Sequence, residues 1–300
     1  MNETTFLMVV SLETPDTVEM TLKNIQSIGG THTVLIYDRV NEQTDSFQIF
    51  SERFSHHAGL RIYEAKKRNQ GLTVSLNQGL ECVETHFTSR VDPGDMSSTN
   101  RIANSLRAFD ENPDLIICGC TASLISEDGK AIYQPRARNH RFVDKQLLAQ
   151  GNPLAHGSIT FVTKAIQKIN GYDAQFRFSQ DYDLYERTLC KYGEKSILLL
   201  GTSHYQRIVS PHSISFNKAR EQSEYSDQIR SRLNSLVITD SNLKQKTLKK
   251  RLFTLGANGQ YQSLLDLSSQ ENCRLLGVAY ILKMFAIRSM PILSRYLYRN

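Results

Sequence analysis

Residues 6–12 read FLMVVSL, a short run of apolar and β-branched side chains. Such a run predicts a buried strand. The segment after it carries an apolar stripe at helical spacing, and Thr14 or Asp16 can cap its N-terminus. Gly29-Gly30 ends this helix. The chain is therefore expected to open with a strand followed by a helix.

Strand and helix patterns keep alternating through the first hundred residues. Strand-like runs lie at 33–37, 60–64 and 87–91, and a helix-like run at 74–83 precedes the last of them. This alternation predicts a mostly parallel sheet with helices on both faces. In such sheets, ligands bind beyond the carboxyl ends of the strands. Asp38 stands at one of these ends.

The second half of the chain changes character near residue 216. Before it, further strand-like runs occur, and the turn at 127–130 predicts a hairpin. After it, only helix-like patterns remain. We therefore expect an α/β domain at 1–216 and a helical, basic region at 217–300.

Length and composition narrow the class of protein. The 300 residues are enough for one large α/β domain with an appendage. No basic n-region opens the chain and no apolar run reaches bilayer length, so neither a signal peptide nor a spanning helix is expected. The five scattered cysteines predict free thiols in a reducing cytoplasm, with Cys118 and Cys120 in the core.

The net charge of +6 is concentrated at the C-terminal end. From Lys244 onward ten basic residues face two acidic ones, and basic and aromatic residues are interspersed in the apolar stretch 275–300. This pattern suits a helix on an anionic membrane surface, such as the inner face of the cell membrane. The alternative is a helical subdomain whose apolar side packs on the α/β domain. No nucleic-acid-binding motif accompanies the charge, so no nucleic-acid partner is expected.

Two acidic stretches carry most of the chemical information. Residues 91–95 read VDPGD at a strand end, and residues 180–184 read QDYDL before an amphipathic helix. A carboxylate pair in a turn can hold a divalent cation against a nucleotide diphosphate, and a separate carboxylate can take a proton from an attacking hydroxyl. Each stretch alone has a structural alternative, namely helix capping or a solvated loop. Arg90 suits either a phosphate or a structural ion pair.

Taken together and in order, the motifs resemble the family 2 glycosyltransferases of the GT-A fold. The resemblance runs from about residue 5 to residue 216. The chain looks most like the bacterial branch of the family, which builds capsular polysaccharide, exopolysaccharide and lipopolysaccharide O-antigen. It is carried by residues 6–12, Ile36-Tyr37-Asp38, Asn69-Gln70-Gly71-Leu72, Leu76-Asn77-Gln78-Gly79-Leu80, Ser89-Arg90-Val91-Asp92-Pro93-Gly94-Asp95, Asn152-Pro153-Leu154-Ala155-His156-Gly157-Ser158, Asn170-Gly171-Tyr172-Asp173 and Gln180-Asp181-Tyr182-Asp183-Leu184.

The resemblance implies a fold and a reaction. The fold would be GT-A, with a Rossmann-like, mostly parallel central sheet between helices and a helical C-terminal extension. The reaction would be inverting, metal-dependent transfer of a hexose from a UDP-sugar to a lipid-linked or oligosaccharide acceptor. The enzyme would work in the cytoplasm, peripherally at the inner face of the membrane.

The resemblance also implies roles for single residues. Asp181 would be the general base, and Asp95, together with Asp92, would hold Mn²⁺ or Mg²⁺. His156 and Arg207 would border the acceptor or the diphosphate. The nucleotide side would be formed by Ser11, Leu12, Glu13, Asp38, Asn69, Arg90, Asp92 and Pro93, with Asp38 accepting a hydrogen bond from uracil.

Two positions depart from the family pattern. Gly94 stands where the metal motif commonly has an aspartate, and Gln180 stands where an acidic residue usually precedes the base. An alternative is therefore a catalytically impaired relative that binds sugar nucleotide or partner proteins in a glycan assembly complex. A more remote alternative is a basic membrane- or nucleic-acid-binding module with an inert α/β core.

Four other side chains have simpler interpretations. His156 is as well explained by a backbone hydrogen bond as by a ligand, and Asp183 by the helix dipole. His56-His57 has Glu52 nearby in sequence, but no cysteine or further histidine completes a metal set. We therefore expect this histidine pair at the surface.

Overall fold

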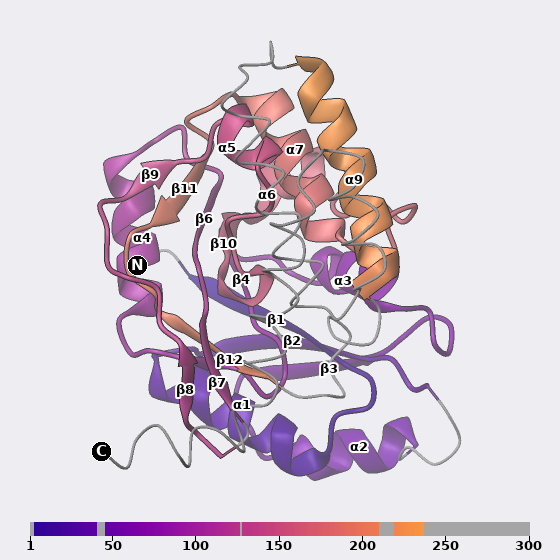
Figure 1. Cartoon of the computed structure of the whole chain (residues 1–300). Helices are drawn as coiled ribbons and strands as arrows, with labels where there is room; N and C mark the ends of the chain where they lie inside the picture. Colours follow the sequence, from indigo (N-terminus) through magenta and orange to yellow (C-terminus); the bar gives the residue numbers. More distant parts are fainter. Residues whose placement is uncertain (1–2, 41–45, 127, 210–218, 237–300) are drawn as a thin grey trace, which may run out of the picture.

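A computed structural model describes residues 3–40, 46–126, 128–209 and 219–236 (Figure 1). The strands are β1 (Thr4–Val10), β2 (His32–Tyr37), β3 (Leu60–Glu64), β4 (Phe87–Arg90), β5 (Met96–Ser97), β6 (Ile117–Cys120), β7 (Ser123–Ser126), β8 (Ala131–Tyr133), β9 (Arg141–Phe142), β10 (Thr160–Val162), β11 (Ile197–Leu200) and β12 (Tyr205–Val209). The helices are α1 (Pro15–Ser27), α2 (Phe47–Phe54), α3 (Leu72–Glu81), α4 (Arg101–Glu111), α5 (Lys145–Ala149), the 3₁₀ turn η1 (His156–Ser158), α6 (Thr163–Lys168), α7 (Gln180–Tyr192) and α9 (Ala219–Leu236).

The main sheet has eight strands in the order β3-β2-β1-β4-β10-β6-β11-β9. The first four are parallel, as the alternating sequence pattern predicts. β10 is antiparallel to both β4 and β6, and β9 is antiparallel to β11. The sheet is thus a parallel Rossmann-like half joined to a mixed half, with β4 at the junction.

Side chains of β1 alternate between two hydrophobic clusters. Leu7 and Val9 pack with α3, α6 and α7 on one face, whereas Phe6, Met8 and Val10 pack with α1 and α2 on the other. Figure 1 shows α1 and α2 together below the strands and α3, α6 and α7 above them. Because both faces of β1 are covered, its sequence is continuously apolar rather than alternating.

A second sheet, in the order β5-β12-β7-β8, lies beside the first. The predicted hairpin is present, since β7 and β8 are antiparallel and enclose the turn. β12 pairs with β5 through Tyr205 opposite Ser97. Since β5 begins directly after Asp95, this pairing brings β12 against the acidic loop that follows β4.

Local capping fixes where several helices begin. The Thr14 side chain accepts a hydrogen bond from the backbone N–H of Thr17, so Thr14 rather than Asp16 caps α1. Ser46 and Asp144 cap α2 and α5 in the same way. These capping side chains occupy helix starts because they satisfy N–H groups that have no partner within the helix.

Helix α9 packs on the α/β domain. It contacts α5 and α7, and Ile229 and Leu233 belong to the same hydrophobic cluster as β1 and α7 (Figure 1). The predicted boundary near 216 and the basic stretch 275–300 lie outside the described residues. No helix in the described part of the chain is both long and apolar enough to cross a membrane.

Candidate active site

The candidate site is built around the loop that follows β4, a central strand. Asp92 and Asp95 lie in this loop, and the backbone N–H of Asp95 donates to the carbonyl of Asp92 at 3.2 Å. This tight turn places both carboxylates at the carboxyl end of a parallel strand. That is where open α/β sheets bind ligands.

Asp95 is held by two groups of β12. The backbone N–H of Ile208 donates to its Oδ1 at 3.1 Å, and the Tyr205 hydroxyl bonds to the same carboxylate. Asp95 is only 7% exposed. Its burial, helped by the negative charge of Asp92, raises its pKa to about 7. A cation would reverse this effect, because a metal ligand must be deprotonated to bind.

Gly94 has a conformational role in the same loop. Its φ of +90° lies in a region that side chains with a Cβ rarely adopt. The space is also limited, since an added Cβ would lie 3.3 Å from Thr17. The Gly94 N–H donates to the Thr21 hydroxyl at 2.9 Å, which ties the loop to α1. The glycine is therefore explained by the shape of the turn.

Asp92 is paired with Arg90, whose side chain is fully buried. The Arg90 guanidinium also donates to the carbonyls of Leu7 and Val91, each at 2.7 Å. These contacts are those of the structural ion pair rather than of a phosphate ligand. Partial burial acts to raise the pKa of Asp92, but the charges of Arg90 and Arg207 lower it overall.

Asp181 lies in the first turn of α7. The Asn152 side-chain amide donates to its Oδ2 at 2.6 Å. Burial raises the pKa of Asp181 despite this hydrogen bond, and the charge of Asp92 adds to the rise. A raised pKa is what a carboxylate needs to take a proton near neutral pH.

Ser179, directly before α7, adopts a left-handed backbone conformation with φ of +57°. Its hydroxyl donates to the carbonyl of Gln222 at 3.0 Å and lies 2.9 Å from the hydroxyl of Ser226. Both partners belong to α9. The turn that presents Asp181 is therefore held from outside the predicted α/β domain.

His156 opens η1 and faces Tyr172. Its Nε2 lies 2.9 Å from the Tyr172 hydroxyl. Burial, with the nearby positive charge of Arg90, lowers the pKa of His156 to about 3. The imidazole is therefore neutral at physiological pH. Its partner is a phenol and not the backbone, unlike the simpler interpretation drawn from the sequence.

Arg207 lies on β12, half-buried, and its charge acts on both Asp92 and Asp95. Gly157 of η1 also lies against this loop. A Cβ at this position would overlap Tyr205 of β12 and come within 2.9 Å of Asp92 Oδ2, so only a glycine fits. Both β12 and η1 thus approach the acidic loop closely.

Asp38 forms a separate polar cluster at the end of β2. Its carboxylate accepts from the N–H groups of Gln70 and Gly71, at 3.1 and 2.8 Å, and from the Ser75 hydroxyl at 3.3 Å. Asp38 is 1% exposed. In this state it fixes the turn before α3, including exposed Asn69, whose φ is +53°.

The loop after β1 supplies the remaining predicted nucleotide-side residues. Glu13 accepts hydrogen bonds from the N–H groups of Ser11 and Leu12, at 2.7 and 3.1 Å. Leu12 is 65% exposed, an unusual position for a large apolar side chain directly after a buried strand. Pro93, by contrast, is half-buried inside the acidic loop.

Among the predicted residues, the structure brings five into one site: Asp92, Asp95, His156, Asp181 and Arg207. Asp92 connects them, since its charge interacts with each of the other four. Arg90 lies beneath the site, in the core.

The sequence reasoning missed two side chains that orient the aspartates. The sequence analysis gave Tyr205 no role, and Asn152 appeared in it only as the first residue of the stretch 152–158. An Asn-Pro pair just before the His156 motif, and a tyrosine two residues before a predicted site arginine, were the available signals. Neither signal identifies a partner more than twenty residues away.

The donor set at Asp92 and Asp95 fits a hard cation. Two carboxylates supply oxygen ligands, which Mn²⁺ and Mg²⁺ accept, and a bound diphosphate would supply others. Asp92 is already deprotonated at neutral pH, and Asp95 is close to its pKa there. The residues present therefore suit metal binding that strengthens when Asp95 ionises.

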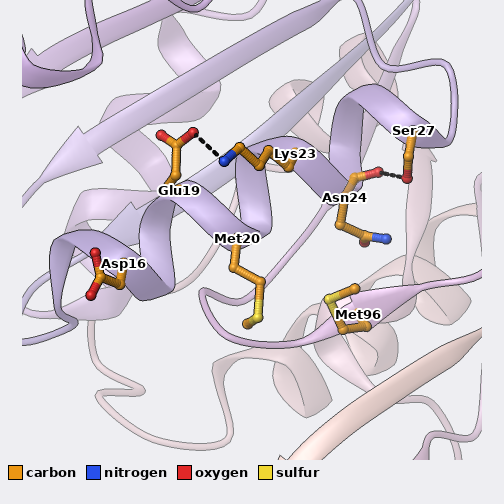
Figure 2. A pocket seen from close by; sticks show the side chains of 7 residues that line it. All are labelled: Asp16, Glu19, Met20, Lys23, Asn24, Ser27 and Met96. Atoms are coloured by element: carbon orange, nitrogen blue, oxygen red, sulfur yellow. Dashed lines mark hydrogen bonds and ion pairs between the residues drawn. The ribbon is translucent and has the colours of Figure 1, made fainter.

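A surface hollow runs along α1 and is lined by Asp16, Glu19, Met20, Lys23, Asn24, Ser27 and Met96 (Figure 2). None of the predicted site residues lines it. It reaches the end of the acidic loop only at Met96.

Comparison of this chain with the sequences of individual proteins finds relatives in bacteria. The amylovoran biosynthesis glycosyltransferase AmsE of Erwinia amylovora is 24% identical over 193 residues, which cover 61% of this chain and 69% of AmsE. The chain is a relative of bacterial cell-surface glycosyltransferases. The minor teichoic acid biosynthesis protein GgaB of Bacillus subtilis is also 24% identical, over 186 residues that cover 60% of this chain and one fifth of GgaB. No family model matches the chain.

Comparison with solved structures supports the GT-A fold that the sequence predicted. The crystal structure of S. aureus TarS residues 1–349 in complex with UDP superposes with a TM-score of 0.55 at 15% identity, covering 99% of this chain and 93% of that one. A TarS complex with UDP-GlcNAc gives a TM-score of 0.54 over the same shares. TarS has the GT-A fold, so the predicted α/β architecture is confirmed. The relatives support a glycosyltransferase in cell-surface polysaccharide synthesis.

Proposed function

We propose that the protein is an inverting, metal-dependent transferase that moves a hexose from a UDP-sugar to a saccharide or lipid-linked acceptor. The observation that carries the proposal is the convergence of Asp92, Asp95 and Asp181. Two carboxylates lie in a turn at the end of β4, and a third, at the start of α7, lies close enough for the charge of Asp92 to contribute to its raised pKa. The TarS complexes with UDP and UDP-GlcNAc support a nucleotide-sugar donor.

In this proposal the acidic loop handles the leaving group. Asp95 and Asp92 would hold Mn²⁺ or Mg²⁺, and the bound cation would supply positive charge to stabilise the diphosphate leaving group. Arg207 adds positive charge on the same side. His156, being neutral, contributes hydrogen bonding rather than charge.

Asp181 handles the acceptor. It removes the proton of the attacking hydroxyl while the oxygen bonds to the anomeric carbon and the bond to the diphosphate breaks. The proton ends on Asp181 and the electron pair on UDP. One displacement inverts the configuration at the anomeric carbon. Asn152 holds the carboxylate in place through its 2.6 Å hydrogen bond.

The remaining residues form the base pocket and the surroundings. We assign the uracil to the region between Ser11–Glu13 and the Asp38 turn. Because Asp38 is satisfied by backbone N–H groups, either its turn opens when the nucleotide binds or a neighbouring carbonyl takes its acceptor role. We propose that the enzyme works peripherally at the inner face of the membrane, where lipid-linked acceptors are found, and that the basic residues of 275–300 are attracted to anionic lipid headgroups.

The test is calorimetric titration of UDP with Mn²⁺ and with EDTA, followed by UDP release assays with candidate UDP-sugars and acceptors. We expect UDP binding that needs both the metal and Asp95, and turnover that needs Asp181. Absence of UDP binding under both conditions would refute the proposal. Metal-dependent UDP binding without turnover on any acceptor would instead favour the catalytically impaired relative.

A further inference from the structure

Three side chains with metal-binding atoms come together far from the acidic loop in sequence. Glu19 lies on α1, and His56 and His57 follow α2. Glu19 Oε2 lies 2.8 Å from His57 Nε2 and 4.0 Å from His56 Nε2. One ligand atom from each of the three side chains lies within 4.8 Å of the other two. The sequence predicted a surface pair near Glu52; the structure instead buries His57 and supplies Glu19 as the third side chain.

The tautomer of His56 is already suited to a metal. Its Nδ1 lies 3.1 Å from the carbonyl oxygen of Arg53, which only accepts hydrogen bonds. Nδ1 therefore carries the proton, and Nε2 presents a lone pair toward Glu19. A hydrogen bond from the second ring nitrogen to a carbonyl is the usual support for a metal-bound histidine. His56 is also largely exposed, so a metal can reach it from solvent.

His57 needs one small rearrangement. At present its Nε2 hydrogen bonds to Glu19, and its Nδ1 lies 3.1 Å from the Gln26 side-chain amide. Moving the proton from Nε2 to Nδ1 frees the lone pair, and rotating the Gln26 amide lets its oxygen accept the new Nδ1–H. The proton count of His57 does not change. Gln26 thus gives His57 the outer hydrogen bond that His56 receives from Arg53.

Glu19 can keep its other partner. Lys23, one turn further along α1, lies 3.2 Å from Oε1 (Figure 2). Both histidines instead approach Oε2. The two oxygens are therefore divided between the lysine and the histidines. The hydrogen bond with His57 and the ion pair with Lys23 together fix the position of the carboxylate.

We propose that Glu19, His56 and His57 form a binding site for a borderline divalent metal ion such as Zn²⁺. In a tetrahedral zinc site, neighbouring ligand atoms lie about 3.3 Å apart, given bond lengths of about 2.0–2.1 Å. The two nitrogen–oxygen separations of 2.8 and 4.0 Å lie on either side of this value. Two imidazoles and one carboxylate leave the fourth position to water, or to another ligand from solution.

The ligand chemistry separates this site from the acidic loop. Imidazole nitrogen favours Zn²⁺, Ni²⁺ and Cu²⁺, whereas a set of carboxylates alone favours Mg²⁺ and Mn²⁺. The bound ion would link α1 to the segment after α2, on the face of the sheet that these helices cover. It would therefore stabilise the folded state, since it binds the native arrangement and not the separated ligands.

The experiment uses metal-stripped, tag-free protein. Co²⁺ replaces Zn²⁺ as a spectroscopic probe, because tetrahedral Co²⁺ absorbs visible light far more strongly than aqueous Co²⁺. We expect one equivalent of Co²⁺ to produce this absorption, Zn²⁺ to displace it, and Zn²⁺ to raise the melting temperature. An excess of Mg²⁺ should leave the absorption unchanged.

Variants identify the ligands. His56→Ala removes an exposed side chain and should weaken Zn²⁺ binding by more than about tenfold, and Glu19→Gln should do the same. His86→Ala, at another exposed histidine, is the matched control and should bind as wild type does. Asp95→Asn should also bind normally, which keeps this result independent of the transferase proposal. Wild-type affinity in His56→Ala, or no tetrahedral Co²⁺ signal in the wild type, would overturn the inference.

Discussion

The hydroxyl of Ser179 lies 2.9 Å from the hydroxyl of Ser226, and this contact joins the start of α7 to α9. Ser179 is two residues before Asp181. A second connection lies nearby, where Asp183, with no exposed surface, pairs with Arg187 of its own helix at 2.8 Å and with Arg232 of α9 at 2.6 Å. Helix α9 therefore holds the segment that carries the proposed base.

We expect Arg232→Ala to lower the turnover rate by about 10- to 100-fold while leaving UDP affinity unchanged, since small misplacements of a catalytic group have effects of this size. The reason is that Asp183 loses one of its two cationic partners and the start of α7 loosens. Arg230→Ala is the matched control, because Arg230 pairs with Asp227 within α9. Equal turnover in the two variants would show that α9 does not position the base.

Asp181→Asn should abolish turnover and spare UDP binding. The expected loss is about 10²- to 10⁴-fold, the range for a general base. Since the base acts when deprotonated and burial raises the pKa of Asp181, wild-type turnover should fall as the pH drops through that raised value. The residual rate of the variant should lack this acidic limb when pH–rate profiles are compared. A profile identical to wild type would assign the proton transfer elsewhere.

Asp95 couples metal binding to pH. Its pKa of about 7 means that the proton must leave before a cation binds, so Mn²⁺-dependent UDP affinity should increase between about pH 6 and pH 8. Asp95→Asn should weaken the metal-dependent binding and flatten its pH dependence. Calorimetry at several pH values measures both effects, and a pH-independent wild type would contradict the assignment.

The same carboxyl affects stability without metal. Its folded-state pKa lies above the unfolded value of about 3.9, so the folded state binds more protons between these values. Stability in EDTA should therefore decrease as the pH rises from about 4 to 7. At pH 8, Asp95→Asn should melt at a higher temperature than wild type in EDTA. A lower melting temperature for the variant would mean that the buried charge is better compensated than these contacts indicate.

Gly94→Asp restores the common family residue, yet we expect it to lose stability. A side chain at φ of +90° costs about 1–2 kcal/mol, and Thr17 restricts the space. Urea unfolding measures the free-energy change. Gly94→Ala is the control for the backbone effect alone, without a carboxylate. If the aspartate variant is as stable as wild type and binds Mn²⁺ more tightly, the turn tolerates a third ligand.

The pattern at residues 6–12 predicted the strand at the centre of the parallel half, and continuous apolarity indicated that both of its faces are covered. The antiparallel placement of β10 was not predictable in this way. Its run at 158–162 is as apolar as a parallel strand, because it too is buried between neighbours. The spacing of apolar residues indicates which side chains are buried. The direction of a strand depends instead on the segments that connect it to its neighbours.

The acidic residues of the candidate site were identifiable in the sequence because they belong to the ordered set of motifs that resembles the glycosyltransferase family. Their supports were not. Tyr205 reaches Asp92 across 113 residues and Glu19 reaches His57 across 38. A tyrosine hydroxyl or a glutamate on a helix face is common, and only the tertiary packing shows which of them meets a partner.

Helix α9 also sets an order of events during synthesis. The ribosome delivers β1 to β12 first, and domains begin to fold as they emerge. At that stage Ser179 lacks its hydrogen-bond partners Gln222 and Ser226, and Asp183 lacks its ion-pair partner Arg232. A nascent chain that ended before residue 219 would carry every side chain of the acidic loop, and Asn152 to hold Asp181, but it would lack the contacts of α9 with the start of α7. The residues of the site are therefore synthesised before α9, but the segment that carries Asp181 is fully held only after α9 has formed.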